Sequence, residues 1–295
     1  MTSPHFTEAQ RRFLTKAGRI ASLALARSDP LYRFLRYATD ADKATIRAAL
    51  VDRRFRFGRP RDFNDPFDCR PHFRVPGLLP ACRRRWFARE SIKLARKRFP
   101  NDPAKEQQAR DELAQYSTES LVKLMEEKVR DRLLDSQLML CLAGNRDALQ
   151  MWAYYADRQR GVAIHLRQDV WPIAAAMQVS YTSRYPTVPL SMHEYDDREL
   201  TRRFVLRKAK AWSHEDEYRV LVQDEDPERF ALEWFDAMTA VLSPGAVAGI
   251  TVGCLMDPAD QKQVAADAKA ATPPVPVYRA VAERRRFALT FEQIA

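Results

Sequence analysis

The sequence predicts an α+β fold of mixed, mainly antiparallel small sheets with a helical insertion. Two observations lead to this prediction. Short apolar runs with strand-like spacing recur along the chain, and helical patterns fall between them without a regular β-α-β alternation. One long stretch, residues 78–135, is almost wholly helical in pattern. No period of about 20 to 50 residues recurs, which excludes a repeat protein.

The chain divides by pattern into an extension and one domain. Residues 1–28 are expected to be a helical extension, because their apolar residues are spaced loosely like one helix face. Residues 29–295 are expected to form a single α+β domain that carries the insertion 78–135. The segment Pro100–Pro103 should divide that insertion into two helices, because proline interrupts a helix.

Strands are expected where short runs are apolar or alternating and end at Gly, Pro or Asp. The predicted strands are Leu31–Tyr37, Arg54–Phe57, Gln137–Leu142, Gly161–Leu166, Gln178–Tyr181, Tyr218–Val222, Ala248–Gly253 and, as the last, Val275–Arg279. Helices are expected where apolar residues recur on one helical side, as Ile46, Ala49 and Leu50 do. The predicted helices outside the insertion are Thr39–Val51, Asp147–Tyr155, Arg198–Ala211, Phe230–Met238 and Ala259–Ala271.

Composition excludes several classes of protein. Apolar residues make up 46% and charged residues 30% of the 295, as in ordinary globular proteins. No apolar run approaches the roughly 20 residues of a membrane span, so we expect no membrane partner and a cytoplasmic protein. The four cysteines form no C-x-x-C pair, and the five histidines have no ligand spacing. No disulfide framework and no metal site are expected.

Positive charge gathers in the first third of this basic chain. Residues 1–100 carry 24 Lys and Arg against 9 Asp and Glu, whereas the remainder carries 25 against 30. Arginine grips phosphate through a planar fork, so a nucleic acid or another phosphate-rich partner would be drawn to the basic half. A solvated arginine-rich surface explains the same pattern equally well.

Three segments mix aromatic and acidic residues densely: Phe63–Asp68, Met151–Asp157 and Trp212–Arg219. Turn chemistry alone accounts for the first, although its rigid loop would also aim Asn64 or Asp68 at a ligand. The second has the helical spacing of a packed core, although its Tyr and Trp rings also suit stacking on a nucleobase or nicotinamide.

The third segment carries the strongest chemical signal. If Glu215 and Glu217 lie on one strand, both carboxylates point to the same face and interact, which suits one of them to proton transfer. Arg219 continues that face and is expected to pair with Glu217. A surface row of ion pairs with Lys208 and Lys210 fits the pattern as well. His165, on an alternating strand, is expected to face outward or to be hydrogen-bonded.

No dinucleotide-binding glycine motif, phosphate-binding loop or serine-nucleophile motif occurs. Together, however, the three segments resemble a bacterial family known as a domain of unknown function, the DUF2971 family, which is associated with abortive infection and phage defence. The resemblance also includes Lys210 and covers roughly residues 30 to 292. The chain departs from that pattern at Leu142–Ala143 and at Tyr154, where the family has an aromatic-serine pair and often a histidine.

More distantly, the chain is similar to ADP-ribosyltransferases: an Arg-bearing first strand, an aromatic middle and a Glu-x-Glu at a later strand edge. This likeness implies NAD as substrate and Glu217 and Glu215 as catalytic residues, the first contacting the nicotinamide ribose and the second orienting the acceptor. Arg33 would hold the phosphates and Tyr155 would stack on the nicotinamide. The residues expected to bind NAD are Tyr32, Arg33, Asn64, Tyr155 and Trp212.

The expected function is therefore an NAD-using ADP-ribosyltransferase or NAD glycohydrolase, acting as a defence or toxin-type effector. Two alternatives stay open. One is a nucleic-acid-binding effector or metal-dependent nuclease with Asp65, Asp68 and Glu217 as magnesium ligands. The other is a non-enzymatic sensor or interaction protein with a protein partner, in which the three segments are only packed core.

Overall fold

The structure, a computed structural model, describes residues 29–74, 137–189, 204–223 and 231–295. Between residues 75 and 136 it describes 102–114 and scattered single residues and pairs. The predicted extension 1–28 lies outside the described residues. The chain separates into two compact units: Met1–Asp62, Gln137–Tyr181 and Lys210–Ala295 form the first, and Phe63–Ser136 and Thr182–Ala209 form the second.

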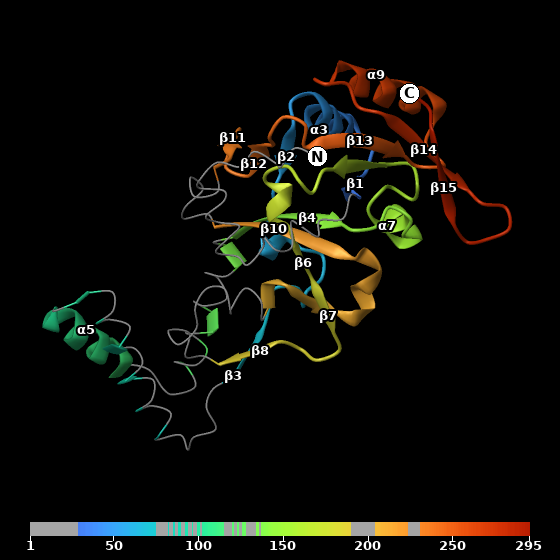
Figure 1. Ribbon diagram of the computed structural model, residues 1–295. Helices are drawn as coiled ribbons and strands as arrows, with labels where there is room; N and C mark the ends of the chain where they lie inside the picture. The colour runs from blue at the N-terminus through green and yellow to red at the C-terminus, as the bar shows by residue number, and fades with distance from the viewer. Residues whose placement is uncertain are drawn as a thin grey trace. The chain divides into compact units, whose positions relative to one another are not determined.

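The first unit is built on an eight-stranded sheet (Figure 1). Its strands are β1 (Leu31–Leu35), β4 (Gln137–Ala143), β5 (Val162–Leu166), β6 (Met177–Gln178), β10 (Glu217–Gln223), β13 (Val247–Val252), β14 (Val277–Ala282) and β15 (Leu289–Gln293). Their order across the sheet is β15-β14-β13-β5-β1-β4-β10-β6. Of the described strand pairs in this sheet, β13–β14 alone is parallel. The α+β prediction is confirmed.

Two helices cover one face of this sheet. Helix α3 (Asp40–Val51) and helix α9 (Pro258–Ala270) pack on the large apolar core made by the alternate strand residues that include Leu140, Val220 and Ile250. Both helices were predicted, and Ile46, Ala49 and Leu50 of α3 are buried as expected. Helix α9 also makes the crossover that lets β13 and β14 run parallel.

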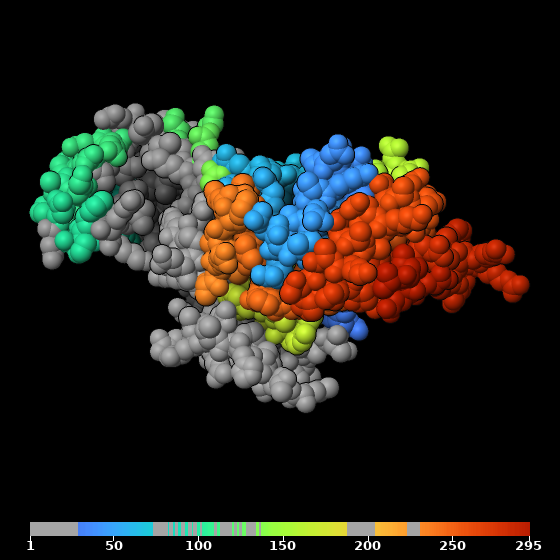
Figure 2. Space-filling model, turned by 90° about the horizontal axis from the view of Figure 1, so that it is seen from above, coloured from blue at the N-terminus to red at the C-terminus, as the bar shows by residue number. Residues whose placement is uncertain are grey.

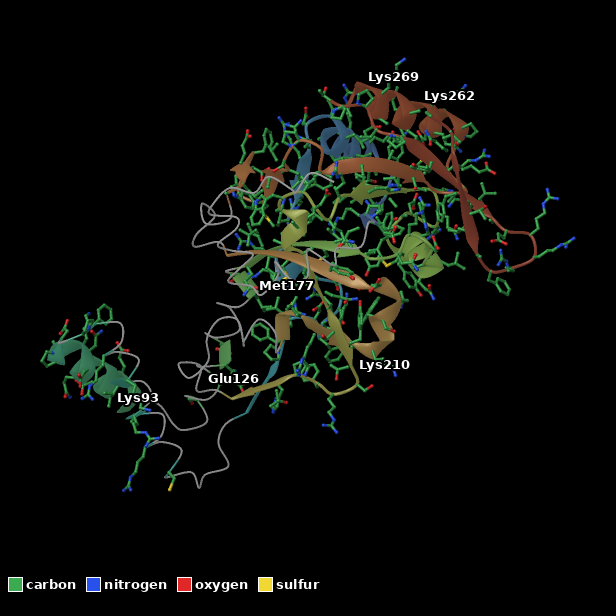
Figure 3. The ribbon with its side chains drawn as sticks, viewed as in Figure 1. Lys93, Glu126, Met177, Lys210, Lys262 and Lys269 are labelled. Atoms are coloured by element: carbon green, nitrogen blue, oxygen red, sulfur yellow. The ribbon has the colours of Figure 1, made fainter. Side chains whose placement is uncertain are left out.

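The two helices lie side by side in Figure 2, α3 in blue and α9 in red. Ion pairs of 2.6 Å join Lys43 to Asp260 and Arg47 to Asp267 across this contact. On the outer side of α9, Lys262 and Lys269 point away from the sheet (Figure 3). Each helix begins at a side-chain cap, Thr39 for α3 and Asp257 for α9, as amide donors at a helix start require.

The opposite face of the sheet carries a smaller core. Helix α7 (Leu149–Tyr154) packs there, and its Met151 and Trp152 are buried against Tyr32 and Phe34 of β1. Strand residues alternate between faces, so Tyr32 and Phe34 meet α7 while Leu31 joins the core under α3 and α9. Both faces of the sheet are therefore covered.

A three-stranded sheet, β11-β12-β2, completes the first unit. Its strands are β2 (Arg54–Arg56), β11 (Glu233–Trp234) and β12 (Thr239–Val241). The helix predicted over Phe230–Met238 is therefore wrong within its described part. Asp236 explains the turn, because its Oδ1 accepts hydrogen bonds from the amides of Met238 and Thr239 at 2.8 and 2.7 Å.

In the second unit, β3 (His72–Arg74) pairs in parallel with β8 (Thr187–Pro189). Helix α5 (Pro103–Ala114) lies within the predicted insertion and begins at the expected proline. The helix predicted over Arg198–Ala211 is wrong at Arg207–Ala209, which is strand β9. The side chains of β9 alternate, with Lys208 buried between exposed neighbours, and that is the period of a strand.

The described residues also form the short elements β7 (Ser180–Thr182) and the 3-10 helices η1 (Pro60–Asp62), η2 (Ile173–Ala175) and η5 (Lys210–Glu215). The strand predicted as the last is β14, but a further strand, β15, follows it. All four cysteines are free, as expected. No helix among the described residues is long and apolar enough to cross a membrane.

Candidate functional site

Two of the three aromatic-acidic segments meet in the first unit. Helix α7 packs against η5, so Met151–Asp157 lies beside Trp212–Arg219. The hydroxyl of Tyr155 donates a hydrogen bond of 2.7 Å to Oε1 of Glu215. In the same two segments, the centroid of the His214 ring lies 6.2 Å from that of the Tyr154 ring and 5.9 Å from that of the Trp212 ring. Tyr155 and Trp212 thus belong to one aromatic and acidic cluster.

Glu215 and Glu217 do not share a strand. Glu215 ends η5, and Asp216 has a φ of +41°, in the left-handed region that interrupts extended backbone. Strand β10 begins only at Glu217. The predicted same-face pair of carboxylates is therefore wrong. Each carboxylate instead has its own partner, Tyr155 for Glu215 and Arg219 for Glu217.

The expected pairing of Glu217 with Arg219 is confirmed, but the pair is buried and not part of a surface row. Arg219 donates from Nε to Oε1 at 2.8 Å and from Nη2 to Oε2 at 2.9 Å. The guanidinium is fully buried, so the ion pair holds the Glu217 carboxylate in one orientation. Burial, and then the Glu217 carboxylate, raises the pKa of the neighbouring Cys141 thiol, which leaves Cys141 unsuited to act as a nucleophile.

The register of the large sheet brings the first strand next to Glu217. Ala143, the last residue of β4, pairs with Tyr32 on one side and with Glu217 on the other. Directly paired residues point to the same face, so Tyr32 and Glu217 flank Ala143 in one row. Two strand spacings separate their Cα atoms, about 10 Å. This row lies on the face that α7 covers.

Arg33 belongs to the other face. It pairs with Ile164 of β5, whose side chain lies in the core under α3 and α9. Its Nη1 donates a 2.6 Å hydrogen bond to the backbone carbonyl oxygen of Cys141. The Arg33 side chain therefore leaves the sheet on the face opposite to the one that carries Tyr32 and Glu217.

Asn64, Asp65 and Asp68 lie in the second unit. Asn64 is exposed, and the predicted turn is present, since Asp65 Oδ1 accepts from the amide of Phe67 at 2.9 Å. Asp68 is buried with Lys208, whose Nζ lies 3.6 Å from its Oδ2. Among the described residues, no three His, Cys, Asp or Glu side chains gather as metal ligands.

Sequence reasoning missed Tyr181 and Gly144, which both contact the segment around Glu217. Tyr181 accepts a hydrogen bond of 2.8 Å from the amide of Glu217 through its hydroxyl oxygen. The amide of Gly144 donates a hydrogen bond of 2.8 Å to the carbonyl oxygen of Asp216. A Cβ at position 144 would lie 2.2 Å from Asp216 Oδ2. A glycine directly after a buried strand is a signal of such close approach.

The chain was compared with models of known families, with curated proteins and with solved structures, and nothing matches it.

Proposed function

We propose that this protein is an NAD-using ADP-ribosyltransferase or NAD glycohydrolase. The observation that carries the proposal is the row of Tyr32, Ala143 and Glu217, with Glu215 and its partner Tyr155 directly beside it. Tyr32 near the start of β1 and Glu217 at the start of β10 lie at one end of one sheet, on the face that helix α7 covers. The role as a defence or toxin-type effector rests on the family resemblance.

Cleavage of NAD is favoured by a carboxylate held in a fixed position near the ribose. When the bond between nicotinamide and ribose breaks, its electron pair leaves with the nicotinamide nitrogen and the ribose C1 becomes cationic. A preorganised carboxylate stabilises that developing charge without reorienting during the reaction. Arg219 donates to both oxygens of Glu217 and so fixes the orientation of this carboxylate.

The second carboxylate suits the second half of the reaction. Water or an acceptor hydroxyl must then attack C1 and lose a proton. Glu215 is buried and already accepts one hydroxyl hydrogen bond, from Tyr155. We propose that Glu215 orients the attacking group and that the Tyr155 ring stacks on the nicotinamide.

Calorimetric titration with NAD tests this proposal. The wild-type protein should bind NAD, Tyr155→Phe should keep most of the affinity, and Tyr155→Ala should lose about tenfold or more, because stacking needs the ring and not the hydroxyl. Tyr154→Ala is the matched control, since Tyr154 is the adjacent tyrosine and 66% exposed. Absence of NAD binding by the wild-type protein would overturn the proposal.

The nucleic-acid alternative rests on the charge of residues 1–100. It predicts binding to RNA or DNA that weakens steeply as salt is raised, and cleavage that a chelator abolishes. We rank it second, because Asp68 is already engaged with Lys208.

A further inference from the structure

The loop between β4 and α7, residues 144–148, carries an arginine that the sequence patterns did not single out. This loop is fastened on both sides of Arg146. Gly144 bonds to the carbonyl of Asp216, and the carbonyl of Arg146 accepts a 2.7 Å hydrogen bond from Nε1 of the fully buried Trp152. The backbone of Arg146 is therefore held between the start of β10 and the core under α7.

The side chain of Arg146 lies against two aromatic rings. Its Cζ is 4.0 Å from the centroid of Phe291 on β15 and 5.6 Å from that of Tyr278 on β14. Stacking on an aromatic face holds the plane of the guanidinium and leaves its N–H edges free to donate. Within the described part of the chain, no hydrogen bond and no ion pair involves this guanidinium.

The charge of Arg146 acts on the same face of the sheet as Tyr32 and Glu217. The ring of Tyr278 stacks on His165 at 5.4 Å, and His165 meets Tyr32 edge-on at 5.1 Å. Burial, and then the positive charge of Arg146, lowers the pKa of His165 to about 3. His165 is neutral and hydrogen-bonded to Thr251 at 2.7 Å, as the sequence led us to expect.

Two other arginines near this face are already engaged by the protein itself. Arg219 is engaged by Glu217, and Arg33 is bound to the Cys141 carbonyl and rises from the opposite face. Asp29 and Asp147 are near enough to act on Tyr32, yet among the described contacts neither pairs with Arg146. Arg146 is half-buried and has no carboxylate partner among the described contacts, so its N–H groups remain available to an anionic ligand.

We propose that Arg146 is the anion-binding residue of this site and receives a phosphate group of a nucleotide substrate, the role expected for Arg33. The nucleotide identity of the substrate rests on the proposed function, whereas the binding of phosphate at Arg146 stands without it. Phe291 and Tyr278 hold the guanidinium flat, and Tyr32 lies between this anion site and the carboxylates.

Calorimetry with ADP-ribose and with inorganic pyrophosphate tests the inference. Arg146→Gln should weaken both by about ten- to hundredfold, the equivalent of charge-assisted hydrogen bonds. Arg146→Lys keeps the charge but loses the planar fork. Its affinity for both ligands should therefore lie between that of the wild type and that of Arg146→Gln. Arg279→Gln is the matched control, an exposed arginine on β14 that pairs with Glu292. Nicotinamide, which has no phosphate, should bind Arg146→Gln as it binds the wild type.

The outcomes separate this inference from the proposed function. Pyrophosphate binding that depends on Arg146, in a protein that does not consume NAD, would support the anion site and contradict the proposed activity. NAD binding that is equal in the wild type, Arg146→Gln and Arg146→Lys would overturn the anion site and leave the activity standing. Absence of any phosphate binding by the wild type, or equal loss in Arg279→Gln, would also overturn it.

Discussion

Arg219 and Glu217 form a buried, bidentate ion pair between two residues that are neighbours on one face of β10. The guanidinium is fully buried and lies across from Cys141 in the register of β4 and β10. A buried pair of this kind is stabilising only while both partners are present, because either charge alone is uncompensated.

Removing one partner should therefore cost more than removing both. We expect Arg219→Met to lower the free energy of unfolding by about 3–5 kcal/mol. The double variant Glu217→Gln with Arg219→Met should recover part of that loss, since the orphaned carboxylate is gone. Urea unfolding followed by circular dichroism measures both. A loss below about 1 kcal/mol in Arg219→Met would show that the pair is not a buried charge contact.

Gly161 should not tolerate a side chain. A Cβ there would lie 2.2 Å from the carbonyl oxygen of Leu35 and 2.8 Å from the Cα of Ala156, both backbone atoms that cannot swing aside. We expect Gly161→Ala to lower the free energy of unfolding by about 3 kcal/mol or more.

Gly245 provides the matched control for that substitution. Its φ is +78°, but nothing lies within 4 Å of a Cβ built there. Gly245→Ala should cost only about 1–2 kcal/mol, the strain of the left-handed backbone. Thermal unfolding of the two variants compares them, and equal losses would contradict the close approach at Gly161.

His165 should make the protein less stable in acid. Its pKa is about 3 in the folded state because of burial, against an ordinary value of 6.5. Between these values the unfolded chain binds the proton and the folded chain does not. The contribution to stability is complete above pH 6.5 and falls by up to about 1.4 kcal/mol per pH unit as the pH drops toward 3.

The variant His165→Gln isolates this effect, because glutamine can still hydrogen-bond Thr251 but does not titrate. The difference in unfolding free energy between wild type and variant should change across pH 6.5 to 3 and be constant above it. A difference that is constant throughout would mean that folding does not shift the pKa of His165.

The sequence identified the elements whose pattern is set locally. Helix α3 has a capping residue and one apolar side, and β1, β4 and β5 are short apolar runs, so periodicity alone locates them. It failed where a side-chain turn or a tertiary contact decides the outcome. The turn at Asp236 and the alternating burial around Lys208 replaced two predicted helices by strands.

In the candidate site, too, local features could be predicted and features set by tertiary contacts could not. The partners Glu217 and Arg219 follow from residue spacing, whereas the face of the sheet that Arg33 occupies does not. Both faces of this sheet are covered by helices, so alternation along β1 alone does not say which side carries the carboxylates. Arg146 was missed because its aromatic partners lie on β14 and β15, far along the chain.

The most direct test of the account is release of nicotinamide from NAD by the purified protein, wild type beside Glu217→Gln, with and without cell extract. We predict release by the wild type and a loss of about a hundredfold or more in the variant, because one preorganised charged group contributes that much to a transition state. Thermal unfolding of both proteins checks that the variant is folded. No release by the wild type under either condition, or equal release by a folded Glu217→Gln, would contradict the assignment of this site as an NAD-consuming one.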